Sequence, residues 1–270
     1  MKLSFSTLGC PDWSLKEIIS FASDQGFEGI EIRGIADKIY APSIPAFSDE
    51  NIGATKASLA RTGLKVPMLT SGAYLCGNAD IEGAMTEVKE YIILAEKLEI
   101  PYVRVLGEPE PDPRVKDIDL NALIENYRAL CDYGQSRNVG VLIETNGFLA
   151  DSVAMRAFME RVDHPNSGII WDVHHTCRFF GEKPADTVRS IGKYIKHTHI
   201  KDSVKGRNGH ITYMLSGYGD IPVEEAYSAL AGMGYDGFWS YEWVKRWSRE
   251  LAEPGVAFYQ YEAYMRSLED

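Results

Sequence analysis

Short apolar runs alternate with longer segments of helical periodicity eight times along the chain, and this alternation constrains the fold more than any other feature of the sequence. The intervening segments carry apolar residues three and four positions apart, as expected of helices with one buried face. Glycines in "RTGLKV" and "GMGYDGFW" mark helix ends shortly before strands. The strand-like runs occupy residues 2–8, 29–34, 65–71, 102–107, 140–145, 168–173, 195–200 and 237–243.

Alternating strands and helices imply a parallel sheet with helices packed outside it. Eight such units in 270 residues predict an α/β fold, a single (β/α)8 TIM barrel over residues 1–270. The alternative is an open doubly wound sheet. The sequence has no G-x-G-x-x-G after the first strand and no P-loop, so the barrel is favoured.

Composition restricts the partners and the compartment. The formal net charge of −11 disfavours a nucleic acid partner, because binding a phosphate backbone needs a concentrated basic surface. No apolar run approaches the roughly 20 residues that span a bilayer, and the N-terminus lacks the apolar core of a signal peptide. The four cysteines are widely spaced and form no C-x-x-C pair, which fits reduced thiols. We expect a cytoplasmic protein without a membrane partner.

Carboxylates and imidazoles stand at the ends of the last four predicted strands: Glu144, Asp172, His199 and Glu242. On a barrel, functional groups lie at this end of the strands. Three converging carboxylates would repel one another unless a cation lies among them. A set of three oxygen ligands and one nitrogen ligand suits one divalent ion, Mn²⁺, Mg²⁺ or Co²⁺, and Zn²⁺ also fits.

Further polar and aromatic residues near the strand ends are candidates for substrate binding. Lys201 is either a pocket group or the partner of Asp202 in a loop ion pair. Glu108 either lines the mouth of the pocket or is solvated. A long loop after the seventh strand is a natural lid. The candidates are His175, which follows Asp172 and can reach a substrate oxygen, Glu31, Trp13, Lys201 and Arg207.

The sequence resembles the xylose-isomerase-like barrel superfamily, specifically its sugar phosphate isomerase/epimerase group, along nearly the whole chain. The resemblance includes "STLGCPDWSLKEIISFASDQGFEGIEIRG", the strands with the four candidate ligands, and "GYGDIPVEEAYSALAGMGYDGFWSYE". It implies that the four ligands bind one divalent metal and that His175, in a D-x-x-H pattern, contacts substrate. Arg207 matches an arginine that follows the metal histidine in the family. Many members form dimers or tetramers, so the resemblance also implies a homo-oligomer.

The resemblance implies an enzyme that acts on a keto sugar or related polyol. A metal at the carbonyl oxygen stabilises an enediolate, and Glu144 and Glu242 flank the substrate as acid and base. Epimerisation, isomerisation and dehydration, as in inosose dehydratases, share this intermediate, so the ligand set does not choose among them. No basic cluster near the loops demands a phosphate, which favours an unphosphorylated substrate.

Two other functions are less favoured. AP endonucleases of the same superfamily need additional histidines from the second and third strands, whereas all six histidines here lie at or after His164. A barrel that binds sugar without turnover would not need the pair of glutamates, Glu144 and Glu242.

Overall fold

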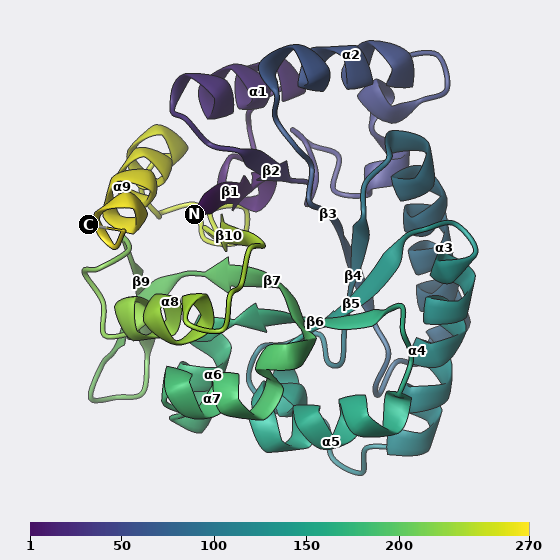
Figure 1. Cartoon of the computed structure of the whole chain (residues 1–270), viewed down its shortest axis with the longest axis vertical. Coiled ribbons are helices and arrows are strands. Elements are labelled where there is room, and N and C mark those ends of the chain that lie inside the picture. Colours follow the sequence, from purple (N-terminus) through teal and green to yellow (C-terminus); the bar gives the residue numbers. More distant parts are fainter. Residues whose placement is uncertain (270) are drawn as a thin grey trace. The chain divides into compact units, whose positions relative to one another are not determined.

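The computed structural model describes residues 1–269 of the chain (Figure 1). The chain divides into two compact units. Unit 1 comprises Met1–Pro67 together with the described residues from Thr198 onward, and unit 2 comprises Met68–His197. Strand β7 (Ile195–Ile200) passes from one unit to the other. The organisation as a single domain therefore stays a prediction.

Unit 1 contains parallel strands that pair in the order β2 (Gly29–Glu31), β1 (Lys2–Ser6), β10 (Phe238–Tyr241) and β7. Its helices and the remaining two strands are α1 (Leu15–Asp24), α2 (Ile52–Thr62), α8 (Val223–Ala231), α9 (Pro254–Ser267), the short η1 (Thr7–Gly9), η2 (Ala41–Ser43) and η3 (Pro45–Phe47), β8 (Asp202–Lys205) and β9 (Ile211–Met214).

Side chains of the unit 1 strands alternate between an apolar face and a polar face, because successive residues of a strand point to opposite sides. On the apolar face, Phe5 of β1 stacks on Phe258 of α9, with ring centroids 4.1 Å apart. Tyr241 of β10 stacks on Tyr261 of the same helix at 4.4 Å. The helix therefore covers the apolar face, and polar residues such as Ser240 occupy the other.

Unit 2 contains four parallel strands that pair in sequence order, β3 (Met68–Tyr74), β4 (Tyr102–Leu106), β5 (Gly140–Glu144) and β6 (Ser167–Asp172), with β7 next to β6. Met68, Leu142 and Ile170 form a buried apolar cluster on these strands. The helices are α3 (Ile81–Leu98), α4 (Leu120–Gln135), α5 (Ser152–Val162), α6 (Val173–Phe180), α7 (Pro184–Ile191), η4 (Gly147–Ala150) and η5 (Gly192–Tyr194).

Several helix boundaries follow from local sequence. Asp119 caps α4 by accepting the N–H groups of Asn121 and Ala122. Gly63 ends α2 in the left-handed conformation, with φ 73°. At the start of α1, Ser14 and Glu17 form a capping box, in which the side chain of each accepts the backbone N–H of the other.

Eight parallel strands, with helices in the connections, confirm the predicted (β/α)8 TIM-barrel fold class. In the described part of the chain, no helix has both the length and the apolarity needed to cross a membrane. All four cysteines are free thiols, and burial raises the pKa of Cys131 and of Cys177 to about 12.

Candidate functional site

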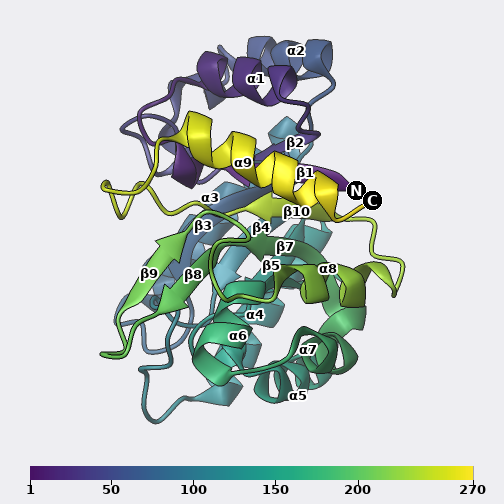
Figure 2. The same cartoon turned by 90° about the vertical axis from the view of Figure 1, so that its left-hand side faces the viewer.

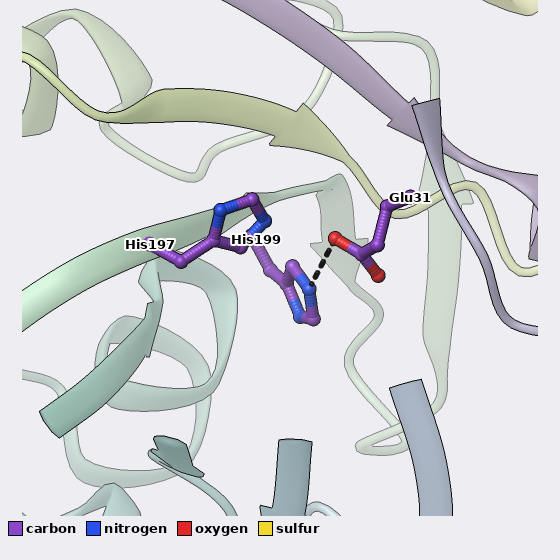
Figure 3. Close-up of side chains that lie close together, drawn as sticks. All are labelled: Glu31, His197 and His199. Carbon is purple, nitrogen blue, oxygen red and sulfur yellow. Dashed lines mark hydrogen bonds and ion pairs between the residues drawn. The ribbon is translucent and has the colours of Figure 1, made fainter. Parts of the chain in front are cut away.

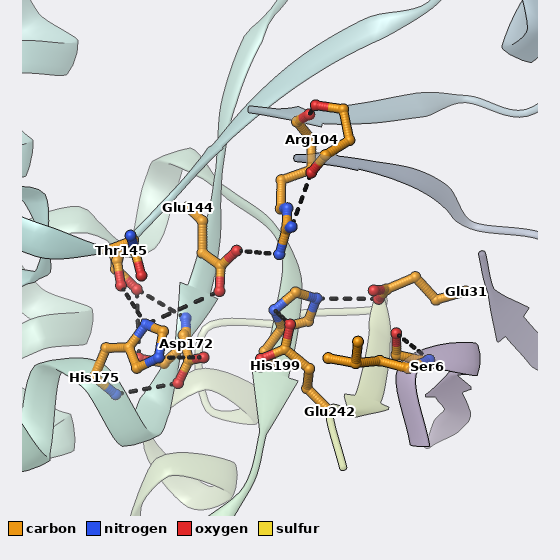
Figure 4. Close-up of polar contacts among 12 residues, drawn as sticks. Ser6, Glu31, Arg104, Glu144, Thr145, Asp172, His175, His199 and Glu242 are labelled. Carbon is orange, nitrogen blue, oxygen red and sulfur yellow. Dashed lines mark hydrogen bonds and ion pairs between the residues drawn. The ribbon is translucent and has the colours of Figure 1, made fainter. Parts of the chain in front are cut away.

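The carboxyl ends of β5 and β6 in unit 2 each present a buried carboxylate, Glu144 and Asp172. Asp172 caps the following helix α6, because its Oδ1 accepts the backbone N–H of His175 at 3.1 Å. Its Oδ2 lies 3.3 Å from Nε2 of the same histidine (Figure 4). Residues at positions three apart face each other on a helix, which explains the D-x-x-H spacing.

His175 lies in the first turn of α6, and His174 belongs to the same helix. His175 Nδ1 lies 2.9 Å from the carbonyl oxygen of Thr145, so this nitrogen carries a proton. Donation from Nε2 to Asp172 then requires the imidazolium form. Asp172, His174 and His175 also offer ligand atoms within 4.8 Å of one another.

Arg104 on β4 is a functional candidate that the sequence reasoning missed. Its Nη1 donates to Glu144 Oε2 at 2.8 Å, and its Nη2 donates to the carbonyl oxygen of Ser71 at 2.8 Å. The arginine is only 6 % exposed, so the ion pair is buried. The available signal was one charged residue in the centre of "YVRVL", an otherwise apolar strand. This contact fixes one oxygen of Glu144.

In unit 1, His199 of β7 is held by a carboxylate at the end of β2. Its Nε2 lies 3.1 Å from Glu31 Oε2, and the Ser240 hydroxyl donates to the same oxygen at 2.9 Å. Figure 3 shows the pair, with His197 earlier on the same strand. An ionised carboxylate only accepts hydrogen bonds, so His199 Nε2 carries the proton.

The other ring nitrogen of His199 faces a second glutamate. Nδ1 lies 3.5 Å from Glu242 Oε1, and in the neutral ring this nitrogen carries a lone pair. Two acceptors at this separation attract a shared cation. A histidine that donates one N–H to a carboxylate and directs its other nitrogen outward is a common feature of metal sites. The donor chemistry therefore fits a divalent metal.

Lys201 is buried and paired with Glu242, not with Asp202. Its Nζ lies 2.5 Å from Glu242 Oε2. The alternative of a loop ion pair between Lys201 and Asp202 is therefore wrong. Asp202 instead accepts four backbone N–H groups at 2.8–3.1 Å, and burial raises the pKa of its carboxyl against the effect of these bonds. The four donors are Ser203, Gly217, Gly219 and Ile221.

Trp13 and Arg207 lie in different surroundings. The Trp13 ring is half-buried and packs on Phe21 and Phe258, with ring centroids 5.0 and 6.0 Å apart. Arg207 is exposed, in the turn between β8 and β9. These two strands pair as an antiparallel hairpin where the sequence predicted a loop (Figure 2). The roles of both residues in substrate binding stay predictions.

The alternative that Glu108 is solvated is wrong. It is 1 % exposed and accepts backbone N–H groups from both the loop after β4 and the segment after β5. The donors are Arg114, Val115 and Phe148. Its function is to hold these two segments of unit 2 together.

Known proteins similar to this chain share its fold. A family model described as "Xylose isomerase-like TIM barrel" matches residues 19–261. A 3-dehydroshikimate dehydratase of Bacillus anthracis is 24% identical over 192 residues, which span 70% of this chain. The match covers 66% of the dehydratase, less than two thirds of its length. Fructoselysine 3-epimerase of Shigella flexneri is 22% identical over 265 residues, 93% of this chain and 92% of the epimerase. The solved structure of the IOLI protein with a binding zinc atom has a TM-score of 0.82 at 19% identity, covering 99% of this chain and 98% of that one.

Proposed function

Because the chain belongs to the xylose isomerase-like TIM barrel family, we propose that it is a divalent-metal-dependent isomerase or epimerase of a keto sugar or related polyol. One observation carries the proposal: His199 donates one ring nitrogen to Glu31 and turns the other toward the Glu242 carboxylate. The similarity to fructoselysine 3-epimerase supports the reaction class.

The proposed ligands are Glu144, Asp172, His199 and Glu242, a candidate set of three carboxylates and one imidazole. This set suits Mn²⁺, Mg²⁺ or Co²⁺, with Zn²⁺ also acceptable, and the similar IOLI protein holds zinc. When bound, such an ion polarises a substrate carbonyl and stabilises negative charge on its oxygen.

The two glutamates are the proposed acid and base. Arg104 holds one oxygen of Glu144, and Lys201 holds one oxygen of Glu242, so each carboxylate has one oxygen fixed by a buried cation. Each glutamate would take or give a proton at the carbon next to the carbonyl. Proton return to the opposite face of the same carbon gives an epimer, and return to the neighbouring carbon gives an isomer.

Solvent exchange tests this proposal. Incubation with Mn²⁺ and a panel of keto sugars in D₂O should place deuterium on a carbon alpha to the carbonyl of the substrate, read by NMR. Glu242→Gln should lower turnover about 10²- to 10⁴-fold, because it removes an acid/base group. The exposed Glu225→Gln on α8 is the matched control. Wild-type turnover in Glu242→Gln, or no deuterium in any product, would refute the mechanism.

A lyase of the dehydratase type is the second candidate, favoured by the similarity to 3-dehydroshikimate dehydratase. Here the same pair of glutamates would remove the alpha proton and protonate a departing β-hydroxyl. The same panel, extended to inososes, separates the two reactions. A lyase product loses one water and gains a conjugated double bond, whereas an epimer or isomer keeps the mass of the substrate.

A further inference from the structure

Arg246 in unit 1 has buried hydrogen-bond donors that no acceptor satisfies. Within residues 1–269, its Nε and Nη2 atoms are buried and have no hydrogen-bond partner. A buried donor without a partner costs about 1–3 kcal/mol, and more when it is charged. Such a cost persists in a folded protein where a ligand supplies the missing acceptor.

The acidic residues near Arg246 are paired with other cations. Asp12 lies 2.7 Å from Arg249, and Asp37 lies 3.2 Å from Lys38. Burial and the neighbouring Arg249 hold the pKa of Arg246 below its usual value, and the smaller effects of Cys10, Asp12 and Asp37 oppose this. The two carboxylates nearest in effect to the guanidinium, Asp12 and Asp37, are thus each paired with another cation.

The segment that carries Arg246 is fixed in place. It follows β10 and Glu242, and the Arg246 backbone N–H donates to the carbonyl oxygen of Leu8, beyond the end of β1. The buried Lys245 donates to the carbonyl oxygens of Arg249 and Leu251 at 3.1 and 2.7 Å. A guanidinium on a segment of this kind is preorganised for a ligand.

A second arginine and an exposed tryptophan extend the same region. The Arg33 guanidinium, two residues after the end of β2, lies 5.9 Å from the ring centroid of Trp247. Trp247 is 58 % exposed, unusual for so large an apolar side chain. The segments after the carboxyl ends of β2 and β10 thus supply two arginines and an aromatic face, at the end of the strands where barrel enzymes bind substrate.

We propose that Arg246 and Arg33, with Trp247 beside them, bind an anionic group of the substrate, either a carboxylate or a phosphate ester. Guanidinium groups bind both through paired N–H donors, and an aromatic ring covers the apolar face of a sugar. The assignment of this anion to the substrate rests on the proposed function; binding of the anion does not. The arginines lie far apart in the sequence, which is why no basic cluster was visible there.

Three ligands with one carbon skeleton test the subsite: D-fructose, D-fructose 6-phosphate and D-fructuronate, titrated calorimetrically into the metal-loaded protein. We expect one or both anions to bind at least tenfold more tightly than the neutral sugar, and the stronger one identifies the group. Arg246→Gln should weaken anion binding about ten- to a hundredfold and leave fructose unchanged. Arg246→Lys should recover only part of the affinity for the anions, because a lysine lacks the paired donors.

Arg249→Gln is the matched control, since this arginine is exposed and already paired with Asp12. It should change anion binding less than threefold. Equal binding of all three sugars, or full anion binding by a folded Arg246→Gln, would overturn the subsite. Circular dichroism verifies folding, and Arg246→Lys replaces Arg246→Gln if the latter does not fold. These are binding measurements, so a failed turnover assay with intact anion binding would contradict the proposed function and not the subsite.

Discussion

Each glutamate proposed to move a proton shares one oxygen with a buried cation, Arg104 for Glu144 and Lys201 for Glu242. A buried carboxylate without a cation is costly, and removing one partner of such a pair typically costs about 3–5 kcal/mol. The same pairing limits the orientations of the carboxylate. Arg104 and Lys201 are therefore positioning residues under the proposed mechanism.

Arg104→Gln should lower kcat about a hundredfold with a smaller change in KM, because Glu144 loses the contact that orients it. Arg104→Lys should restore part of the rate by keeping the charge. Steady-state kinetics measure both, and the pH profile should shift in Arg104→Gln because the charge next to Glu144 is gone. The exposed Arg114→Gln in the same unit is the control. A wild-type kcat and pH profile in Arg104→Gln would show that Arg104 has only a structural role.

The polar residues at strand ends could be predicted from the sequence, because a carboxylate or imidazole directly after an apolar run is a local sequence pattern. Glu144 and Asp172 do end β5 and β6. The pairing of His199 with Glu31 could not be predicted, since it joins residues 168 positions apart. Glu31 was predicted to bind substrate, and the structure pairs its carboxylate with His199 Nε2 at 3.1 Å.

At the scale of elements, the β8–β9 hairpin is joined to the turn at residues 217–221 through Asp202. Two positions of this turn require glycine for physical reasons. A Cβ on Gly219 would lie 2.0 Å from Asp202 Oδ1, and Gly217 has φ +82°. One buried carboxylate thus organises a segment that would otherwise be an unsupported loop.

Asp202→Asn should destabilise the fold by about 2–4 kcal/mol, because an amide offers one oxygen where two accept four backbone N–H groups. Hydrogen exchange should rise in residues 202–221 before it rises elsewhere. Gly219→Ala should produce the same local pattern by steric overlap. Asp220→Asn, at an exposed position of the same turn, is the control for this region. Unchanged exchange in both Asp202→Asn and Gly219→Ala would contradict the role of Asp202.

Elements were predictable where periodicity was strong and not where a short polar segment decided the conformation. All eight parallel strands overlap their predicted runs. Helix α6 was missed because "VHHT" continues an apolar strand without a break, and its start depends on the Asp172 cap. The hairpin was missed because "DSVK" and "ITYM", with four residues each, are too short to show a periodic pattern.

At the scale of the molecule, the eightfold alternation was sufficient to predict the fold class. Alternation depends on burial of apolar faces, which the sequence displays directly. The reaction depends on a few polar contacts and on the substrate. The sequence indicates these only through its resemblance to a known family. The fold class was therefore predictable from the sequence, and the function only as a class of reactions.

Removal of metal should lower the thermal stability of the whole chain. A ligand present at a hundred times its Kd stabilises the native state by about 2.7 kcal/mol, which for a chain of this size corresponds to about 5–10 °C in Tm. We expect EDTA to lower Tm by this amount and Mn²⁺ to restore it. Glu242→Gln should show a smaller difference between the two conditions. An identical Tm with EDTA and with Mn²⁺ in the wild type would exclude a tightly bound ion.

The exposure of Trp247 has a practical consequence. Trp171, Trp239 and Trp243 are buried and Trp13 is half-buried, so Trp247 is the indole most open to an added quencher such as acrylamide. Because Trp247 lies next to the Arg33 guanidinium, we expect its fluorescence emission to change when a ligand binds beside Arg33. The chain thereby contains an intrinsic optical reporter, and a library of metabolites could be screened against the unlabelled protein before any reaction is known.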